Sequence, residues 1–335
     1  MKYLVVALLL LSGCASIAIN AAPKKKANPV QSEQSKAAND VFWTALHAGN
    51  YDALPGVIEL LQQAYLADPT DAITTAHLGF AHIWKAAERV RLEKVPATIT
   101  DHLLLSQRYF AEAFEMTNDW RFAGFLAGAE LANGTIHKDE KLVRQGFFRM
   151  KEAVAAFPEF NLFASGYQAS SAAVDSDRFK QGLEAMWKNV DFCFDGKVSR
   201  ADPDYGPVMF METQVGTRRV CWNNWITPHN HEGFALNLGD MLVKAGDLKA
   251  GRRMYENAKL SKTYAQWPYK DLLEKRLANI NENTEIFRKP TAEVPKDRLM
   301  MYASEANCAG CHADAPAEVA ATTFTQRNEN RTHGR

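Results

Sequence analysis

The sequence has no excess of charge of either sign. Its 335 residues include 39 Lys and Arg against 39 Asp and Glu, so the formal net charge is zero. Nucleic-acid-binding domains show a basic excess or a basic stripe, and this balance gives that class no support. With 47% hydrophobic and 23% charged residues, the composition is that of a globular chain and not of a disordered one. The length allows one or two domains with a substantial core.

Long apolar runs are lacking as well. The run from Leu4 to Leu11 is too short to cross a bilayer as a helix. It follows Lys2 and leads through small residues to Cys14, which is the arrangement of an export signal. Residues 1–13 are therefore predicted to form a signal peptide.

The end of this signal, Leu11-Ser12-Gly13-Cys14, resembles the lipobox of bacterial lipoproteins. The resemblance implies cleavage before Cys14 and attachment of lipid to its thiol and amino group; a plain secretory signal containing a cysteine is the alternative. With Ala15 next to the lipidated residue, we expect an outer-membrane anchor and a periplasmic body, and display at the cell surface stays open. Residues 14–39 are polar and include Lys24-Lys25-Lys26. They are expected to form a flexible tether with a reach of about 25–30 Å.

The body of the chain, from Val41 to about Phe287, shows a helical period of 3.6 residues and few alternating stretches, which predicts an all-α fold. We divide it into residues 40–189 and 232–290. The second part contains two apolar stripes separated by Gly246-Asp247, where a helical hairpin is expected to turn. The stripes are Phe234, Leu238, Met241, Leu242 and Ala245, then Leu248, Gly251, Tyr255 and Ala258.

Within this hairpin, Leu238-Gly239, Gly246-Asp247, Tyr255 and Ala258 have the spacing of a tetratricopeptide repeat, which the unit resembles. The resemblance implies a solenoid of helical hairpins with a concave surface for partners. A generic helical bundle has the same stripes and is the alternative. Weaker and irregularly spaced matches begin at Ala67-Asp68-Pro69, Asn118-Asp119-Trp120 and Phe157-Pro158-Glu159.

Residues 190–231 interrupt the helical period and are rich in Pro, Gly, Asp and aromatic residues. An insertion of this length in a helical array is often functional. Cys193 and Cys221 lie near its ends, and in an oxidising compartment we expect a disulfide between them. Such a bond would contribute about 3–4 kcal/mol on the chain-entropy model.

The same insertion contains thioethers and imidazoles of the kind that copper prefers, at Met209, Met211, His229 and His231. These motifs are short and common. Core methionines and histidines at the start of a helix explain them without a metal. Copper is kept as an alternative.

The residues that carry chemistry are Cys308, Cys311 and His312, which form a Cys-x-x-Cys-His motif. This is the attachment motif of c-type haem, in which two thiols form thioethers and the histidine binds the iron. A redox-active disulfide would need a βαβ context, and a zinc site would need a second pair of ligands nearby. The sequence therefore predicts one covalent haem, with His312 as the proximal ligand.

The haem-binding segment, residues 291–325, resembles only the opening of a small cytochrome c, in which a helix such as Arg298–Asn307 enters the motif. The 23 residues after His312 are too few for the remaining helices of that fold and contain no Met, and residues 326–335 are expected to be disordered. The haem must then lie against the body or a partner. The distal ligand is open, with candidates His231, then His229, then Met300 or Met301, then none.

These observations predict a lipid-anchored, periplasmic monohaem cytochrome c whose helical body docks a redox partner. Two alternatives stay open. One is a haem-dependent oxidoreductase of the peroxidase kind, which needs an open coordination position. The other is a scaffold of an envelope complex in which haem is structural or sensory. Whether the protein is an enzyme is not decided by the sequence.

Overall fold

The computed structural model describes residues 17–18, 21–48, 50–87, 89, 92–194, 196–206, 231–261, 264–267, 269–290, 293–295 and 298–300. These residues contain no β-strand. The α-helices are α2 (Glu33–Ala48), α3 (Leu54–Ala67), α4 (Ala72–Ala87), α5 (Asp101–Thr117), α6 (Trp120–His137), α7 (Glu140–Ala156), α8 (Pro158–Ala169), α9 (Asp177–Phe194), α10 (His231–Ala245), α11 (Leu248–Ala258), α12 (Lys270–Ala278) and α13 (Ile280–Arg288). Short 3₁₀ turns are η1 (Tyr51–Ala53), η3 (Ala97–Thr100) and η5 (Tyr264–Gln266).

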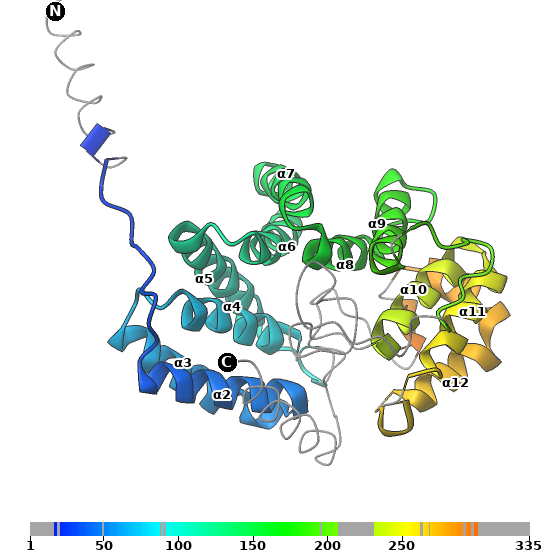
Figure 1. Ribbon diagram of the computed structural model, residues 1–335, viewed down its shortest axis with the longest axis horizontal. Coiled ribbons are helices and arrows are strands. Elements are labelled where there is room, and N and C mark those ends of the chain that lie inside the picture. The colour runs from blue at the N-terminus through cyan, green and yellow to red at the C-terminus, as the bar shows by residue number, and fades with distance from the viewer. Residues whose placement is uncertain are drawn as a thin grey trace, which may run out of the picture.

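Consecutive helices pack as antiparallel hairpins, α4 with α5, α6 with α7, α8 with α9, and α10 with α11. Figure 1 shows these pairs following one another in a curved array, with α2 and α3 at one end and α11 and α12 at the other. The predicted all-α architecture of helical hairpins is confirmed. Within the described part of the chain, no helix is both long and apolar enough to span a membrane.

The hairpin of α10 and α11 forms where its sequence predicts. Gly246 adopts a φ of +93°, which a residue with a Cβ rarely takes, and Asp247 caps α11 by accepting a 3.1 Å hydrogen bond from Ala250 N. Gly239 lies so close to the ring of Tyr255 that a Cβ there would overlap it. Both helices bury the predicted stripe at this contact.

The weaker upstream matches also mark helix boundaries. Asn118 takes a left-handed conformation (φ 54°) at the end of α5, and the Asp119 side chain caps α6. Pro158 occupies the first turn of α8, where its missing N–H costs nothing. In these places the local capping chemistry, and not a strict 34-residue repeat, determines where each helix starts.

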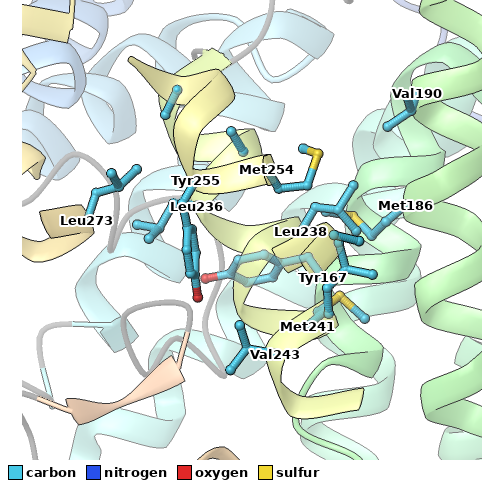
Figure 2. Close-up of a cluster of buried hydrophobic side chains, with 14 of the residues drawn as sticks. Tyr167, Met186, Val190, Leu236, Leu238, Met241, Val243, Met254, Tyr255 and Leu273 are labelled. Carbon is cyan, nitrogen blue, oxygen red and sulfur yellow. The ribbon is translucent and has the colours of Figure 1, made fainter. Parts of the chain in front are cut away.

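The buried side chains form three clusters. One lies between α2, α3 and α4, and a second between α4, α5 and α6. The largest joins α8 and α9 to α10, α11, α12 and α13, and Figure 2 shows Met186, Leu238, Met254 and Tyr255 converging in it. This third cluster supports the part of the chain that leads to the predicted haem motif.

Lys244 fastens α10 to the preceding hairpin. Its side chain is 4% exposed, and Nζ donates 2.8 Å hydrogen bonds to the carbonyl oxygens of Ser170 and Ala172, just beyond α8. Burial lowers the pKa of Lys244 to about 8. The ammonium therefore joins α10 to the α8–α9 turn through two main-chain acceptors.

The structure corrects the extent of the tether, which we predicted to run from residue 14 to 39. Helix α2 begins at Glu33, so the body starts seven residues earlier. Ser35, Ala38 and Asn39 are buried in α2, and Asn39 Nδ2 donates a 3.1 Å hydrogen bond to Thr74 Oγ1 on α4. A polar composition predicts solvation, but here hydrogen bonds between helices satisfy the polar side chains.

The insertion also begins later than predicted, because α9 continues to Phe194. The described residues that follow fold onto the body. Arg200 donates hydrogen bonds of 2.7 and 2.6 Å to the two carboxylate oxygens of Asp191, and Asn257 on α11 donates a 2.7 Å hydrogen bond to Pro203 O. Tyr205, one of the aromatic residues of this insertion, is 4% exposed and belongs to the largest core cluster.

Candidate functional site

Most residues that the sequence predicts to carry chemistry lie outside the described residues: Cys14, Met209, Met211, Cys221, His229, Met301, Cys308, Cys311 and His312. Of the others, His231 is the first residue of α10 and Cys193 lies in the last turn of α9, and only their main chain is described. The haem, the disulfide and a copper site stay predictions. What the structure describes is how the body holds the segment that leads to the motif.

Arg276 on α12 makes the central contact with this segment. It is 2% exposed, and one guanidinium nitrogen donates a 2.5 Å hydrogen bond to the carbonyl oxygen of Leu299. Its Nε donates a 3.1 Å hydrogen bond to Oδ1 of Asp240 on α10, which is completely buried. The ring of Phe287 lies 4.9 Å from the guanidinium carbon. One buried cation thus joins two helices to the approaching chain.

Tyr255 on α11 completes the arrangement by donating a 2.6 Å hydrogen bond to the same oxygen of Asp240. Burial raises the pKa of Tyr255 well above its usual range, and the nearby Asp240 raises it further. The phenol therefore remains a donor at any physiological pH. We call Asp240, Tyr255 and Arg276 the Arg276 cluster.

Two further contacts hold the same segment. Arg298 donates a 2.8 Å hydrogen bond to Oδ1 of Asn283 on α13 and lies 3.3 Å from a carboxylate oxygen of Glu282. Met300 packs against the largest core cluster. Residues 298–300 contain no α-helix, so the predicted helix from Arg298 does not begin at that residue.

Asn237 lies one helical turn before Asp240, on the same face of α10. It is 1% exposed, and neither amide atom has a hydrogen-bond partner anywhere in the described chain. An unpaired buried amide costs about 1–3 kcal/mol. A haem carries two carboxylate side chains that accept hydrogen bonds, so this amide fits such a group.

A second titratable pair lies at the other end of the molecule. Nδ1 of His82 on α4 is 2.9 Å from Nδ1 of His102 on α5, and the ring of Tyr109 stacks on His82 at 5.6 Å. Burial and the neighbouring His102 lower the pKa of His82 to about 4. Two histidines alone do not make a metal site, and no group of three or more His, Cys, Asp or Glu side chains that suits a metal occurs in the part of the chain described.

The chain ahead of α2 is also attached to the body. Lys25 forms an ion pair with Glu112 on α5, and Tyr65 on α3 donates a 2.9 Å hydrogen bond to the same carboxylate. Asn28 donates a 2.9 Å hydrogen bond to Asp68. The contact with Glu112 raises the pKa of Lys25. The part of the predicted tether from Lys25 onward is therefore attached to the body.

Comparisons of the chain with protein-family models, with curated proteins and with solved structures return no match. The functional argument therefore rests on the residues of this chain. Sequence reasoning missed the Arg276 cluster, because Asp240 and Arg276 are 36 residues apart and each belongs to an ordinary amphipathic helix. The local signal is a series of polar residues at helical spacing on α10, Asn237, Asp240 and Lys244, all of which are buried.

Proposed function

We propose that this protein is a periplasmic, lipid-anchored monohaem c-type cytochrome that transfers electrons, with a helical-hairpin body that docks its redox partner. The observation that carries the proposal is the Cys-x-x-Cys-His motif at Cys308, Cys311 and His312, in a chain that opens with an export signal. A haem bound there supplies a one-electron ferric–ferrous couple, whose potential depends on the distal ligand and on burial.

The residues of the body limit where the motif lies. Arg276, Arg298 and Met300 hold the chain on α12, α13 and the core. Cys308 follows Met300 by eight residues, which reach at most about 29 Å when fully extended. In this proposal the body covers the haem, which the short segment around the motif cannot do alone. Asn237 on α10 offers an amide that can donate a hydrogen bond to a haem carboxylate.

The length of chain between Cys14 and Lys25 likewise limits how far the body can lie from the lipid anchor. Eleven residues separate Cys14 from Lys25, which is paired with Glu112, and eleven extended residues reach at most about 40 Å. With the lipid on Cys14, the α3–α5 end of the body would therefore stay close to the membrane. Replacing Cys14 by Ser should release the protein from membrane fractions, since no described helix spans a bilayer.

Haem staining of denatured protein tests the proposal. The chain is expressed with its signal in a host that matures c-type cytochromes, and the wild type is compared with a Cys308→Ser, Cys311→Ser variant. We expect staining of the wild type only, with unchanged helical circular dichroism in both. A Cys193→Ser, Cys221→Ser variant is the matched control, because it also replaces two cysteines and leaves the motif intact. Staining that survives loss of Cys308 and Cys311 would contradict the proposal.

The two alternative functions give different results with the same protein. A low-spin haem without peroxide turnover supports electron transfer. A high-spin ferric haem that turns over hydrogen peroxide supports the oxidoreductase. A partner that still binds the variant without haem supports the scaffold.

A further inference from the structure

A groove lies between α7 and α9, with α8 as its floor. Its volume is about 550 Å³, within the range of about 300–1,000 Å³ that bound ligands occupy in proteins. Figure 1 shows α7 and α9 as two ridges standing apart, with α8 between their bases. The groove involves neither the Arg276 cluster nor the segment leading to Cys308, so what it binds does not depend on the haem.

The floor of the groove is apolar. Met150 and Val154 come from α7, Leu162 from α8, and Ala185 from α9. At one end the apolar surface continues onto Phe147, which is 44% exposed, and onto the neighbouring Phe148, which is 58% exposed. Exposed aromatic side chains beside an apolar groove are typical of interaction surfaces.

The rim of the groove is cationic. Lys151, Arg178, Lys180 and Lys188 line it, together with one carboxylate, Glu184. None of the three lysines forms an ion pair in the described part of the chain, and Lys151 lies over the ring of Phe147 at 5.7 Å. Because the whole chain has no net charge, this concentration of positive charge is local. It favours an occupant with acidic side chains.

Gln168 on α8 adds an unsatisfied polar group to the lining. Its amide is packed against Gly128 of α6, and neither Nε2 nor Oε1 has a hydrogen-bond partner among the described residues. Rotation of this side chain toward an occupant would exchange an unpaired amide for a paired one. The groove thus has an apolar floor, a charged rim and one buried, unpaired amide beneath its lining.

The length of the groove matches that of a short helix. On α9 the lining runs from Arg178 to Lys188, eleven residues over which the helix rises about 15 Å, or nearly three turns. Helices pack with their axes about 8–10 Å apart, which is the spacing expected between α8 and a helix bound over it. Recognition of this kind uses apolar side chains at positions i, i+3 or i+4, and i+7 of the bound helix.

We propose that this groove binds an acidic amphipathic helix of a partner protein. The apolar stripe of that helix lies on Met150, Val154, Leu162 and Ala185, and its acidic side chains face Lys151, Lys180 and Lys188. The mode of binding predicts strong dependence on salt, because the ion pairs at the rim are solvent-exposed.

A designed peptide tests the proposal on the full-length protein. The probe is a labelled peptide of about four helical turns, with Leu at i, i+3, i+4 and i+7 and Glu at the positions that flank this apolar stripe. Its matched control has Lys in place of every Glu. Binding is followed by fluorescence anisotropy up to about 1 mM protein. We expect the acidic peptide to bind and the basic peptide not to bind.

Charge reversal locates the binding. A Lys151→Glu, Lys180→Glu, Lys188→Glu variant should weaken binding of the acidic peptide at least about tenfold. A Lys151→Gln, Lys180→Gln, Lys188→Gln variant should weaken binding of the acidic peptide less. It provides the same test if the Glu variant does not fold. The control is a Lys141→Glu, Lys249→Glu, Lys289→Glu variant, which changes the net charge equally on exposed positions outside the lining.

Four outcomes would overturn the proposal. The acidic peptide fails to bind, or both triple Glu variants weaken its binding equally. Dodecanoate binds in the groove while the peptide does not, which would make it a site for a single-chain anionic lipid. The protein forms a dimer, and the Lys151→Glu, Lys180→Glu, Lys188→Glu variant is monomeric while the control triple variant is still dimeric. That result would make the occupant a second copy of this chain.

Discussion

The guanidinium of Arg276 donates a 2.5 Å hydrogen bond to the carbonyl oxygen of Leu299, nine residues before Cys308. The acceptor is main chain, so the contact does not depend on which side chain occupies position 299. The other side of Arg276 is held by Asp240. The buried ion pair of the body and the segment that leads to the predicted haem motif are therefore linked through one residue.

Replacing Arg276 by Ala should lower the free energy of unfolding by about 3–5 kcal/mol, because it breaks the buried ion pair of Arg276 with Asp240. Equilibrium unfolding in urea measures this loss. The control is Arg144→Ala, since the ion pair of Arg144 with Glu140 is solvent-exposed and should matter by less than about 1 kcal/mol. Equal effects of the two substitutions would contradict the central role of Arg276.

Gly239 and Gly56 form a matched pair of helical glycines. Alanine at Gly239 places its Cβ against the buried ring of Tyr255 and should destabilise the protein by about 1–3 kcal/mol. Alanine at Gly56 on α3 meets no atom within 4 Å and should stabilise it by about 0.5–1 kcal/mol. Thermal unfolding of both variants measures whether each is less or more stable than the wild type. A stabilising Gly239→Ala would mean that α10 and α11 do not pack in this way.

His82 should make the protein sensitive to acid. Its pKa in the folded state is about 4, against about 6.5 in an unfolded chain, so the unfolded state binds more protons between these values. Stability therefore falls as the pH falls from about 6.5 toward 4, by up to about 3 kcal/mol, and is fully present above pH 6.5. Its neighbours are His102 and Tyr109, and no carboxylate contributes to its lowered pKa.

Urea unfolding at pH 7 and pH 4.5 measures this effect in a His82→Leu variant. We expect the difference in unfolding free energy between the two pH values to shrink relative to the wild type. His137→Leu serves as the control, because His137 is exposed at the end of α6 and should leave the difference unchanged. An unchanged pH dependence in His82→Leu would show that the histidine pair is not buried as described.

Asn237 offers a test of the proposed haem contact that does not depend on activity. In the Cys308→Ser, Cys311→Ser protein, Asn237→Leu should raise the free energy of unfolding by about 1 kcal/mol, since an unpaired buried amide is removed. In the haem-loaded protein we expect a smaller gain or a loss. Asn257→Leu is the control and should destabilise both forms, because Asn257 hydrogen-bonds Pro203 and Tyr205. If Asn237→Leu raises the free energy of unfolding equally in both forms, Asn237 does not contact the haem.

The sequence predicts the helical hairpins where local chemistry determines them. Gly246-Asp247 ends one helix and caps the next, and the small Gly239 admits the ring of Tyr255. Each of these interactions joins residues that are close along the chain, at most 16 positions apart. Patterns of spacing and capping report such contacts directly.

What the sequence does not predict depends on contacts between distant residues. Ser35 and Asn39 look like parts of a solvated linker, yet α4 lies against them, and Asn39 Oδ1 is 2.6 Å from Nδ1 of His77. Lys25 looks like one member of a basic run, but its partner Glu112 is 87 residues away. Composition describes the average environment of such residues, and their partners are visible only in the folded chain.

The most direct test of the account is whether haem stays on the purified, exported protein after extraction with acidified acetone, followed by the absorption spectrum. The account predicts that the haem absorbance stays with the polypeptide, because two thioethers from Cys308 and Cys311 hold it covalently. A colourless protein, or haem that passes into the acetone, would contradict the assignment of a c-type cytochrome.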